Sequence, residues 1–394
     1  MNYILFDNPN RTDLLPFTFT RPVADIRIGI LTIREKWEKW LDVKTSTLTE
    51  EYLSKKYPLV KGKHNILING SVCPNEKLIE QVQKLKRNQA LVHDDYLIAI
   101  HLNEEDIENL ESTENIEDIE TNVPHIKIQQ LWDIFSKNAD AIKEDFALLT
   151  KNKESNAVSK TNTLICPENI FIEHDVKMEC AVLNATDGPI YIRHHAEIME
   201  GAVIRGPFAL GEFAIVKMLA KIYGATTIGP YSKVGGEVSN SVIFGYSNKA
   251  HDGFLGNSVL GEWCNIGADS NNSNLKNNYT NVKLWNYPEK KFIDTGLQFC
   301  GLIMGDHSKC GINTMFNTGT VVGINSSIFG HGFQRNFIPS FSWGSTSTGM
   351  TTFEINKAIE VAERVFERRG LVFDEIEKNI LRNIYNLTRE YRNL

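Results

Sequence analysis

An aliphatic residue recurs at every sixth position through the middle of the chain. The register runs for eight steps without a break, and the residue four places after each aliphatic one is small or β-branched at all but one step. A period of six is neither the 3.6 of an amphipathic helix nor the 2 of a single strand. The aliphatic set is Ile192, Ile198, Ile204, Leu210, Val216, Ile222, Ile228 and Val234. The chain must therefore repeat one short structural unit many times.

Such a hexad corresponds to one face of a three-sided column. A short strand points its aliphatic side chain inward, and a tight corner follows, where inner side chains crowd and a small residue is needed. Three faces close one coil, and each coil is stabilised by its neighbours in the stack. The register resumes after a phase shift, and again after an insertion of some thirty residues, at Phe254, Leu260 and Ile266, then at Met304, Cys310, Phe316 and Val322. The fifteen hexads predict about five coils.

The segments before and after the hexads have other patterns. Residues 104–120 are strongly acidic and predict an exposed helix or loop. The remaining pattern predicts strands near residues 3–6, 65–68, 90–92 and 96–101, and helices near 31–41 and 76–86. The predicted divisions are an α/β domain at 1–150, a polar linker at 151–163, the column at 164–345, and two amphipathic helices within 346–394.

Composition and charge exclude several classes of function. The chain has 42 basic and 49 acidic residues, a formal net charge of −7, and no long basic run, so we expect no nucleic-acid partner. No stretch approaches a membrane span, and the first residues lack a signal-peptide pattern, so we expect no membrane partner. The six cysteines are scattered without metal-ligand spacing, which favours a cytoplasmic protein and predicts no metal ligands.

The sequence resembles a known family at residues 15–37, LPFTFTRPVADIRIGILTIREKW, and through its hexads. The family is that of the bifunctional N-acetylglucosamine-1-phosphate uridylyltransferases/glucosamine-1-phosphate N-acetyltransferases, and the likeness is greatest to a divergent bacterial branch. The resemblance implies an α/β nucleotidyltransferase-like domain, then a left-handed parallel β-helix of hexapeptide repeats, then C-terminal helices. It also implies a homotrimer with substrate clefts between subunits, acetyl-CoA as cosubstrate, and Mg²⁺ for nucleotidyl transfer.

The resemblance also implies which histidine is catalytic. The family has a general-base histidine on a β-helix loop and, fourteen residues later, an asparagine that opens an Asn-Ile-Gly-Ala run. His251 and the run from Asn265 to Ala268 reproduce this spacing. A neutral imidazole accepts a proton in the useful pH range, so His251 is the predicted base and Asn265 a predicted substrate contact. The alternative is an ordinary histidine on a surface loop.

Other site residues are implied in the same way, with departures from the family. Lys221 matches a phosphate-binding basic residue, whereas Ser239 replaces another, and Phe254 replaces a tyrosine that holds substrate. Asp306 and Ile324 match positions that contact acetyl-CoA. We interpret the remaining histidines of this region as residues of the coil surface: His194, His195, His307 and His331.

The α/β domain departs further from the family. The glycine-rich phosphate loop is replaced by residues 7–11, which contain no glycine. Arg11 and Arg21 are predicted to hold nucleotide phosphates through guanidinium forks, with Arg27 nearby; the alternative is that they are salt-bridged arginines. Asn69, also predicted to contact nucleotide, replaces the aspartate that binds the metal, which weakens the case for Mg²⁺.

Three functions remain open. The first is an acetyl-CoA-dependent N-acetyltransferase acting on a hexosamine 1-phosphate, glucosamine 1-phosphate above all, coupled to nucleotidyl transfer that forms a UDP-N-acetylhexosamine. The second is a uridylyl or thymidylyl transferase whose β-helix only regulates or assembles it, and the third is a non-catalytic trimeric scaffold. A metal-dependent hydratase is disfavoured, because it needs three converging histidines. The insertion at residues 271–299, with Lys276, Lys283 and Trp285, either supplies missing substrate contacts or is a solvated loop.

Overall fold

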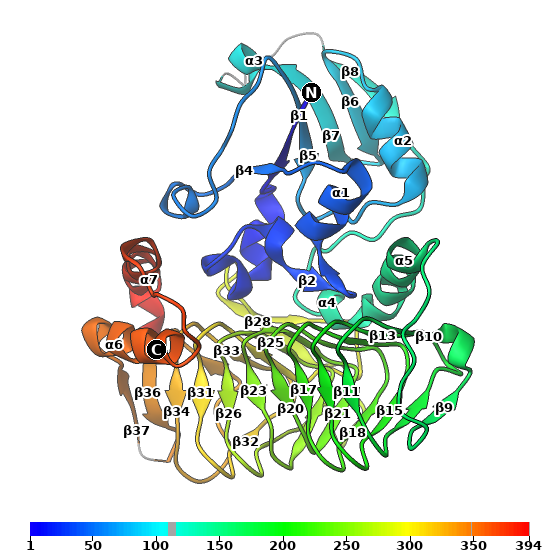
Figure 1. The fold of residues 1–394 in the computed structure, drawn as a ribbon. Helices are drawn as coiled ribbons and strands as arrows, with labels where there is room; N and C mark the ends of the chain where they lie inside the picture. Colours follow the sequence, from blue (N-terminus) through cyan, green and yellow to red (C-terminus); the bar gives the residue numbers. More distant parts are fainter. Residues whose placement is uncertain (109–115, 348, 394) are drawn as a thin grey trace.

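An α/β domain lies on a parallel β-helix in the computed structural model, which describes residues 1–108, 116–347 and 349–393. Figure 1 shows the α/β domain above the column of coils, with the two C-terminal helices packed at one end of the column. The fold class predicted from the sequence, an α/β domain followed by a parallel β-helix and helices, is confirmed.

The α/β domain is built on one mixed sheet of six strands in the order β4-β1-β5-β7-β6-β8. Strands β4, β1 and β5 run parallel, whereas β7 is antiparallel to both β5 and β6. The strands are β1 (Asn2–Phe6), β4 (Ser46–Leu48), β5 (His64–Asn69), β6 (Gln89–His93), β7 (Tyr96–Asn103) and β8 (Glu117–Glu120). The helices are α1 (Ile33–Leu41), α2 (Glu76–Lys84), α3 (Glu104–Glu108), α4 (Asp133–Ser136) and α5 (Asn138–Thr150), and a small hairpin joins β2 (Arg27–Ile28) to β3 (Leu31–Thr32).

The acidic stretch contains a strand that the sequence pattern did not indicate. Within residues 104–120 the chain forms α3 and then β8, which pairs in parallel with β6 at the edge of the sheet; residues 109–115 lie outside the described part of the chain. Strand β8 buries only part of Ile119, and its acidic residues face solvent. Charged side chains are common on edge strands because they discourage pairing with other chains. For this reason the acidic composition did not indicate a strand.

Three sheets form the β-helix. The covered sheet, on which the α/β domain lies, consists of β10 (Ile170–Ile172), β13 (Ile190–Ile192), β16 (Phe208–Leu210), β19 (Thr226–Ile228), β22 (Val242–Gly245), β25 (Val259–Glu262), β30 (Leu302–Met304), β33 (Thr320–Val322) and β35 (Phe337–Ile338). The second sheet consists of β11 (Lys177–Met178), β14 (Glu197–Ile198), β17 (Ile215–Val216), β20 (Lys233–Val234), β23 (Asn248–Lys249), β26 (Asn265–Ile266), β31 (Lys309–Cys310), β34 (Ser327–Ile328), β36 (Ser342–Ser345) and β37 (Gly349–Thr352). The third sheet consists of β9 (Thr163–Ile165), β12 (Val182–Asn184), β15 (Val203–Arg205), β18 (Lys221–Tyr223), β21 (Glu237–Ser239) and β24 (Phe254–Gly256), and a separate parallel pair joins β27 (Asn271–Asn272) to β32 (Met315–Phe316).

The aliphatic residues of the unbroken register fill the interior of the β-helix, as predicted. All eight, from Ile192 to Val234, are at most 1% exposed. The predicted number of coils is wrong, because the covered sheet alone has nine strands. Additional coils precede the register, and the coils differ in length. Counting only strict six-residue repeats therefore underestimates the number of coils. One inward assignment is wrong as well: Leu255, not Phe254, faces the interior.

A ladder of stacked rings runs along the corner between the covered and second sheets. Successive centroids are 4.2–5.0 Å apart. The corner residues have positive φ, which costs a non-glycine residue roughly 1–2 kcal/mol, whereas a stacked aromatic pair contributes about 0.5–1.5 kcal/mol. Stacking thus offsets much of the strain. The ladder consists of His195, Phe213, Tyr231, Tyr246 and Trp263.

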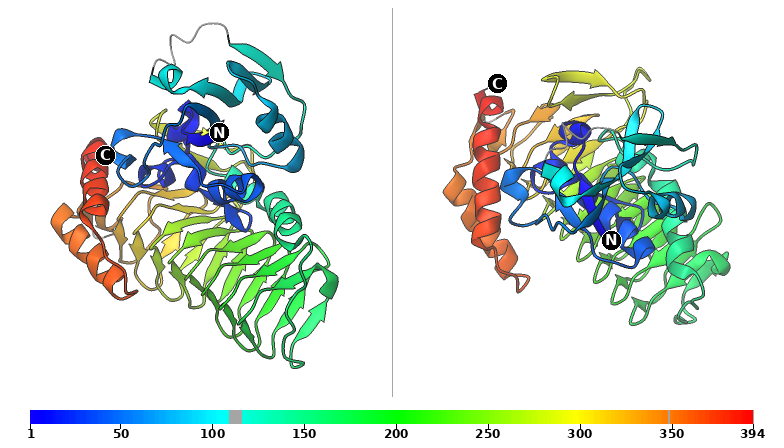
Figure 2. Two further views of the ribbon diagram at one scale, coloured as in Figure 1. Left: turned by 45° about the horizontal axis from the view of Figure 1, so that its top comes forward. Right: turned by 90° about the horizontal axis from the view of Figure 1, so that it is seen from above.

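The C-terminal helices lie at one end of the column (Figure 2), and the insertion packs against the last residues of the chain. Helix α6 (Ile355–Glu367) extends the ladder, since Phe366 stacks on Trp263 at 4.0 Å, and α7 (Glu375–Leu387) follows it. The insertion forms a hairpin of β28 (Lys283–Asn286) and β29 (Lys291–Asp294). Its Trp285 is buried and stacks on Phe337 at 4.2 Å, and Asn286 donates to Asp13 of the α/β domain at 2.9 Å. The hairpin is therefore packed against both domains and is not a solvated loop.

The α/β domain covers the outer face of the covered sheet. Phe171, Tyr191 and Ala209, on successive strands, form an apolar cluster with Ile142 of α5. Nearer the C-terminal end, the ring of Phe17 lies 4.9 Å from that of Phe244. Polar contacts cross the same interface: the Thr227 hydroxyl donates to the carbonyl of Gly29 at 2.9 Å. The two domains are thus joined along most of the column.

Arg21 anchors the α/β domain to the corner of the column. Its guanidinium pairs with Asp306, and with Glu262 at 3.1 Å. Asp306 also accepts from the Thr20 hydroxyl at 2.7 Å and from the backbone N–H of Glu262 at 2.9 Å. Burial alone would lower the pKa of Arg21, but the two carboxylates raise it. A buried charge of this kind is tolerated only while its partners are present.

Asp306→Asn should therefore destabilise the folded protein by about 3 kcal/mol, because it leaves much of the Arg21 charge uncompensated. Urea unfolding, together with limited proteolysis between the domains, measures the effect. Glu80→Gln is the matched control, since Glu80 pairs with Lys84 at the surface of α2, where an ion pair contributes about 0–1 kcal/mol. Equal losses in the two variants would contradict this role for Arg21.

Candidate functional site

His251 lies at an exposed corner between the second and third sheets. Strand β23 ends at Lys249, β24 begins at Phe254, and residues 251–253 form the bend between them. The side chain of Lys249 is buried, and its Nζ donates to the carbonyl oxygens of His251 at 2.5 Å and Asp252 at 3.3 Å. The bend that presents the imidazole to solvent is therefore held from inside the column.

Lys249 belongs to the candidate site, and the sequence interpretation missed it. It stands beside Val234 in the register, at a position that other coils fill with aliphatic residues. Burial lowers the pKa of Lys249 to about 8, against a weaker opposing effect of Asp252. The signal was present in the sequence: where the register breaks, a lysine stands two residues before the histidine. The column accepts this charge because the carbonyl oxygens of the bend solvate it.

Lys221 and Phe254 lie in one row on the outer face of the third sheet. The register aligns Lys221 with Glu237, and Glu237 with Phe254. Lys221 Nζ is 3.3 Å from a Glu237 oxygen, and the Tyr223 hydroxyl donates to the same carboxylate at 2.6 Å. Ser239 lies in the neighbouring row, beside Tyr223. The row thus carries a solvent-accessible cation, a carboxylate and an aromatic ring on three successive strands, and Phe254 comes three residues after His251.

Asn265 lies on the outer face of the second sheet, on the other side of the same corner. Its side-chain oxygen accepts from Asn248 Nδ2 at 2.9 Å, and Asn248 comes three residues before His251. The next strand places Lys309 beside Asn265. Burial lowers the pKa of Lys309 to about 8, and its Nζ donates to the carbonyl of His307 at 2.8 Å. The outer face of the second sheet thus carries an amide pair near the His251 bend, whereas the Lys309 ammonium points toward the opposite corner, at His307.

Asp306 and Ile324 do not share this edge. They lie in successive coils at the corner between the covered and second sheets, beneath the α/β domain. Asp306 is 2% exposed and already paired with Arg21, and Ile324 is fully buried. Within one chain, the predicted contact with acetyl-CoA would require this interface to open. His307, expected at the coil surface, is buried against Phe366, and burial lowers its pKa well below the usual value.

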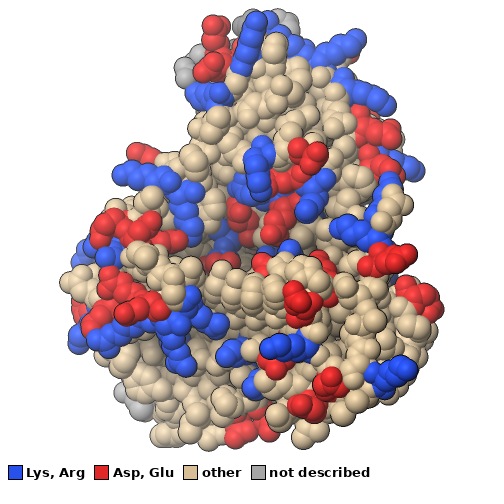
Figure 3. All heavy atoms as spheres, viewed as in Figure 1, with Lys and Arg blue, Asp and Glu red and all other residues tan. Residues whose placement is uncertain are grey.

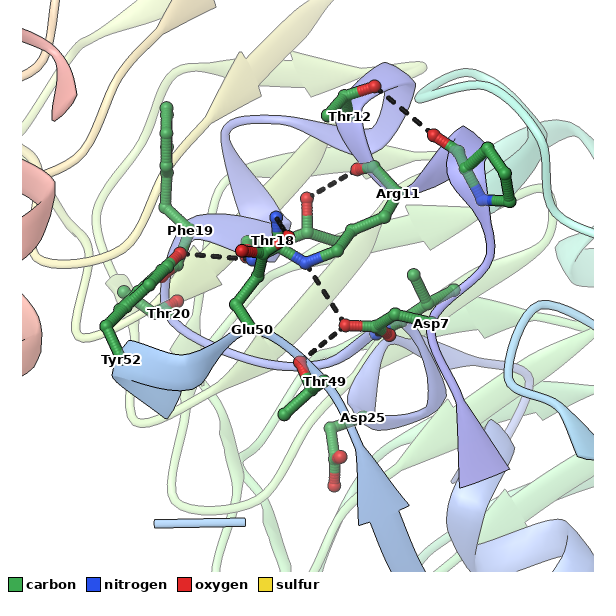
Figure 4. Close-up of polar contacts among 12 residues, drawn as sticks. Asp7, Arg11, Thr12, Thr18, Phe19, Thr20, Asp25, Thr49, Glu50 and Tyr52 are labelled. Atoms are coloured by element: carbon green, nitrogen blue, oxygen red, sulfur yellow. Dashed lines mark hydrogen bonds and ion pairs between the residues drawn. The ribbon is translucent and has the colours of Figure 1, made fainter. Parts of the chain in front are cut away.

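Arg11 is enclosed by acceptors at the carboxyl edge of the α/β sheet (Figure 4). Its guanidinium donates to Asp7 at 3.1 Å, to the Tyr52 hydroxyl at 3.0 Å and to the carbonyl of Thr18. Glu50 lies 3.7 Å away. Arg21 is engaged in the same way at the domain interface. Both arginines therefore adopt the salt-bridged arrangement left open by the sequence, and neither presents a free fork to a phosphate.

Asn69 and Asp7 meet where β5 and β1 end. Asn69 Oδ1 accepts from Asn8 Nδ2 at 2.9 Å and from the Ser71 hydroxyl at 2.8 Å. Asp7 accepts from the backbone N–H of Val23 at 2.7 Å, from the Thr49 hydroxyl at 2.6 Å and from Arg11, and burial raises its pKa. Mg²⁺ prefers charged oxygens that are free to bind it. The oxygens of Asn69 and Asp7 are already engaged by hydrogen bonds within the protein, so they do not fit a magnesium site.

Charges of both signs are interspersed on the face seen in Figure 3, including the hollow between the two domains. A general nucleic-acid binder would show a single-sign basic surface. Among the helices of the described residues, none has both the length and the hydrophobicity of a membrane span.

Comparison with known proteins gives a match to one protein family and similarity to individual bifunctional enzymes. Residues 3–154 match the family model described as sugar nucleotidyl transferase. The chain is similar to the bifunctional protein GlmU of Methanococcus aeolicus, with 29% identity over 223 residues that cover 56% of this chain and 49% of that protein. It is also similar to the bifunctional sugar-1-phosphate nucleotidylyltransferase/acetyltransferase of Sulfurisphaera tokodaii, with 31% identity over 43% of this chain and 40% of that protein. The chain thus spans half or less of the length of these relatives.

The comparisons therefore relate this chain to transferases. The sugar nucleotidyl transferase match covers residues 3–154, and the similarity to the GlmU protein of Methanococcus aeolicus covers 56% of the chain. The two relatives described are archaeal, so the bacterial branch stays a prediction. Among solved structures, the polySia specific acetyltransferase NeuO has 13% identity and a TM-score of 0.28, covering 53% of this chain and 94% of its own, which is too weak a likeness to support an inference.

Because the ammonium group of Lys249 is buried, the difference in unfolding free energy between the wild type and Lys249→Met should depend on pH. The pKa is about 8 when the protein is folded and about 10.4 when it is unfolded, so the unfolded chain binds more protons between these values. The stability of the wild type relative to Lys249→Met should therefore rise by about 1–3 kcal/mol between about pH 7 and about pH 10. Urea unfolding across this range measures it. Lys233→Met, on the outer face of neighbouring strand β20, is the control, and the same trend in both variants would exclude the buried ammonium as the cause.

Proposed function

We propose that the β-helix acetylates the amine of a hexosamine 1-phosphate, with acetyl-CoA as donor and glucosamine 1-phosphate as the expected substrate. The α/β domain then transfers a uridylyl group to the product, forming a UDP-N-acetylhexosamine. The observation that carries the proposal is the exposed imidazole of His251, on a bend whose carbonyl oxygens are held by the buried Lys249. The bifunctional relatives support the pairing of the two activities.

In the proposed reaction, His251 accepts a proton from the substrate amine as its nitrogen attacks the thioester carbonyl. The carbon–nitrogen bond forms, the carbon–sulfur bond breaks, and coenzyme A leaves as the thiol once the proton is returned to sulfur. A positioned general base typically contributes about 10²- to 10⁴-fold in rate. Because Lys249 fixes the carbonyl oxygens of the bend, the backbone that carries the imidazole is held in place before substrate binds.

The outer rows beside the bend suggest how the sugar phosphate binds. Lys221 is 63% exposed in its side chain, so a phosphate can approach its ammonium group and compete with Glu237. Asn265, already paired with Asn248, supplies amide groups for sugar hydroxyls. Phe254 offers a ring without a hydroxyl, so part of the substrate contact made by tyrosine in the family is replaced by packing.

The same corner favours assembly as a homotrimer. Large apolar side chains are exposed at the same corner two coils before and two coils after the bend: Met218 is 62% exposed, Leu219 75% and Ile312 70%. Exposed apolar surface that recurs along one edge can form an interface between subunits. A neighbouring subunit placed here would enclose His251 in the predicted intersubunit cleft.

The trimer can be tested directly. Sedimentation equilibrium should give three times the chain mass of 44.7 kDa, and Leu219→Glu, which places a charge in the apolar interface, should shift the protein toward the monomer. Lys217→Glu, in the same coil, is the control for added charge. A wild-type protein that remains monomeric at assay concentration would contradict the proposed cleft.

The uridylyl half rests on the family match of residues 3–154. The nucleotide must be held by groups other than Arg11 and Arg21, because both guanidinium groups are engaged by carboxylates of the protein. A cytoplasmic location is part of the proposal, since all six cysteines are free thiols.

The decisive experiment follows thiol release from acetyl-CoA with glucosamine 1-phosphate, and then pyrophosphate release after addition of UTP and Mg²⁺. His251→Ala should lower the kcat of thiol release by about 10²- to 10⁴-fold. Pyrophosphate release from N-acetylglucosamine 1-phosphate and UTP should be unchanged, because that reaction belongs to the other domain.

His331→Ala, which removes an exposed histidine from a different bend, is the matched control and should leave both activities intact. Pyrophosphate release without any thiol release would overturn the acetyl-transfer proposal and favour a nucleotidyltransferase with a regulatory β-helix. Failure of both reactions, with no binding of acetyl-CoA or UTP by calorimetry, would favour the scaffold.

A further inference from the structure

Three side chains at the start of the β-helix converge on one point outside the column. They are His174, Asp175 and His195, all exposed, and their ligand atoms lie within 4.8 Å of one another. Asp175 Oδ2 is 2.9 Å from His174 Nδ1 and 3.8 Å from His195 Nδ1. One carboxylate oxygen thus lies between two imidazole nitrogens, at the end of the column away from the C-terminal helices.

Coil stacking fixes this arrangement. Strand β10 aligns Ile172 with Ile192, and β11 aligns Lys177 with Glu197, so Asp175 and His195 occupy the same corner position in successive coils. Both residues have φ of 58°, in the left-handed region. The equivalent backbone conformations direct both side chains outward from the same corner.

Neighbouring groups hold the histidine rings in place. His195 stacks on Phe213 with 4.8 Å between centroids. His194, whose ring stacks on that of His174 at 5.3 Å, is hydrogen-bonded through Nδ1 to Glu173 at 2.8 Å. The Tyr191 hydroxyl donates to the same carboxylate at 2.6 Å. Packing and hydrogen bonds that orient ligand side chains are characteristic of metal sites.

We propose that His174, Asp175 and His195 form a binding site for a divalent transition metal of the zinc type. In a tetrahedral zinc site, ligand atoms at about 2.0–2.2 Å from the metal are about 3.3 Å from one another. The separations of Asp175 from His174 and His195, 2.9 and 3.8 Å, lie on either side of that value, and all three ligand atoms lie within 4.8 Å of one another, so side-chain rotations can bring them to a common ion. Two imidazoles and a carboxylate suit zinc or cobalt better than calcium or magnesium, which prefer oxygen ligands.

The site joins two coils. The first coil of a stack has a neighbour on only one side, so its contacts are fewer than those of an interior coil. A metal held by His174 and Asp175 from one coil and by His195 from the next would cross-link this end. Metal binding should therefore raise the thermal stability of the protein through mass action. The site lies at a different corner from His251, so it is independent of the proposed acetyl transfer.

Calorimetric titration of the tag-free full chain with Zn²⁺ tests the proposal, and Co²⁺ with visible absorption tests the geometry. We expect one ion per chain, a tetrahedral Co²⁺ spectrum and a higher midpoint of thermal unfolding. His174→Asn, Asp175→Asn and His195→Asn should each weaken binding by about tenfold or more. Asparagine is chosen because it tolerates positive φ at positions 175 and 195, so the corner keeps its backbone.

His331→Asn and Cys180→Ser are the controls, since an exposed imidazole and an exposed thiol elsewhere also attract zinc. Both should bind like the wild type. Failure of the wild type to bind at micromolar Zn²⁺, or equal binding by the wild type and the three asparagine variants, would overturn the site. Loss of binding in Cys180→Ser alone would show that a cysteine binds the metal, and it would also overturn the proposed site.

Discussion

Packing between successive coils is the constraint on which the rest of the molecule depends. Each inward side chain, such as Leu210 or Ile228, is buried only because the coils above and below it are in place. The register that satisfies this packing also repeats every corner position along the column. Side chains far apart in the chain, such as Glu262 and Asp306, thereby become neighbours. The interior packing thus determines where charged and catalytic groups can gather.

One corner joins the two domains and carries much of the polar chemistry of the column. It begins with the histidines of the first coils, continues as the stacked ladder to Trp263, and ends at the pair of carboxylates that hold Arg21. The α/β domain is thereby fixed over the covered sheet. His251 lies at another corner, where the apolar side chains remain exposed. This division leaves one edge exposed, while another edge joins the two domains.

Much of the fold follows from the sequence, because its signals are local and periodic. The inward residues from Ile192 to Val234 and the capping box of α1, in which Thr32 and Glu35 bond each other's backbone, are set by residues close in the chain. The prediction failed where the pattern was broken by a charge. Lys249 occupies an inward position, and β8 carries mostly acidic residues on an edge strand. Composition alone gives the wrong environment for both.

For the candidate site, too, local signals in the sequence were informative and long-range contacts were not predictable. Asn265 lies one coil after Asn248, which precedes His251 by three residues, so the two predicted residues lie on successive coils, and their roles stay predictions. No comparable local signal separates Arg21, a predicted phosphate ligand, from an arginine buried between domains, since its partner Asp306 is hundreds of residues away.

The sequence by itself determined the coiled architecture and the histidine at its corner, because both depend on short-range spacing. Only the tertiary structure decided which charged side chains face solvent and which form ion pairs between the domains. It also decided that His174 and His195 meet, because those outcomes depend on how coils stack and how the α/β domain docks upon them.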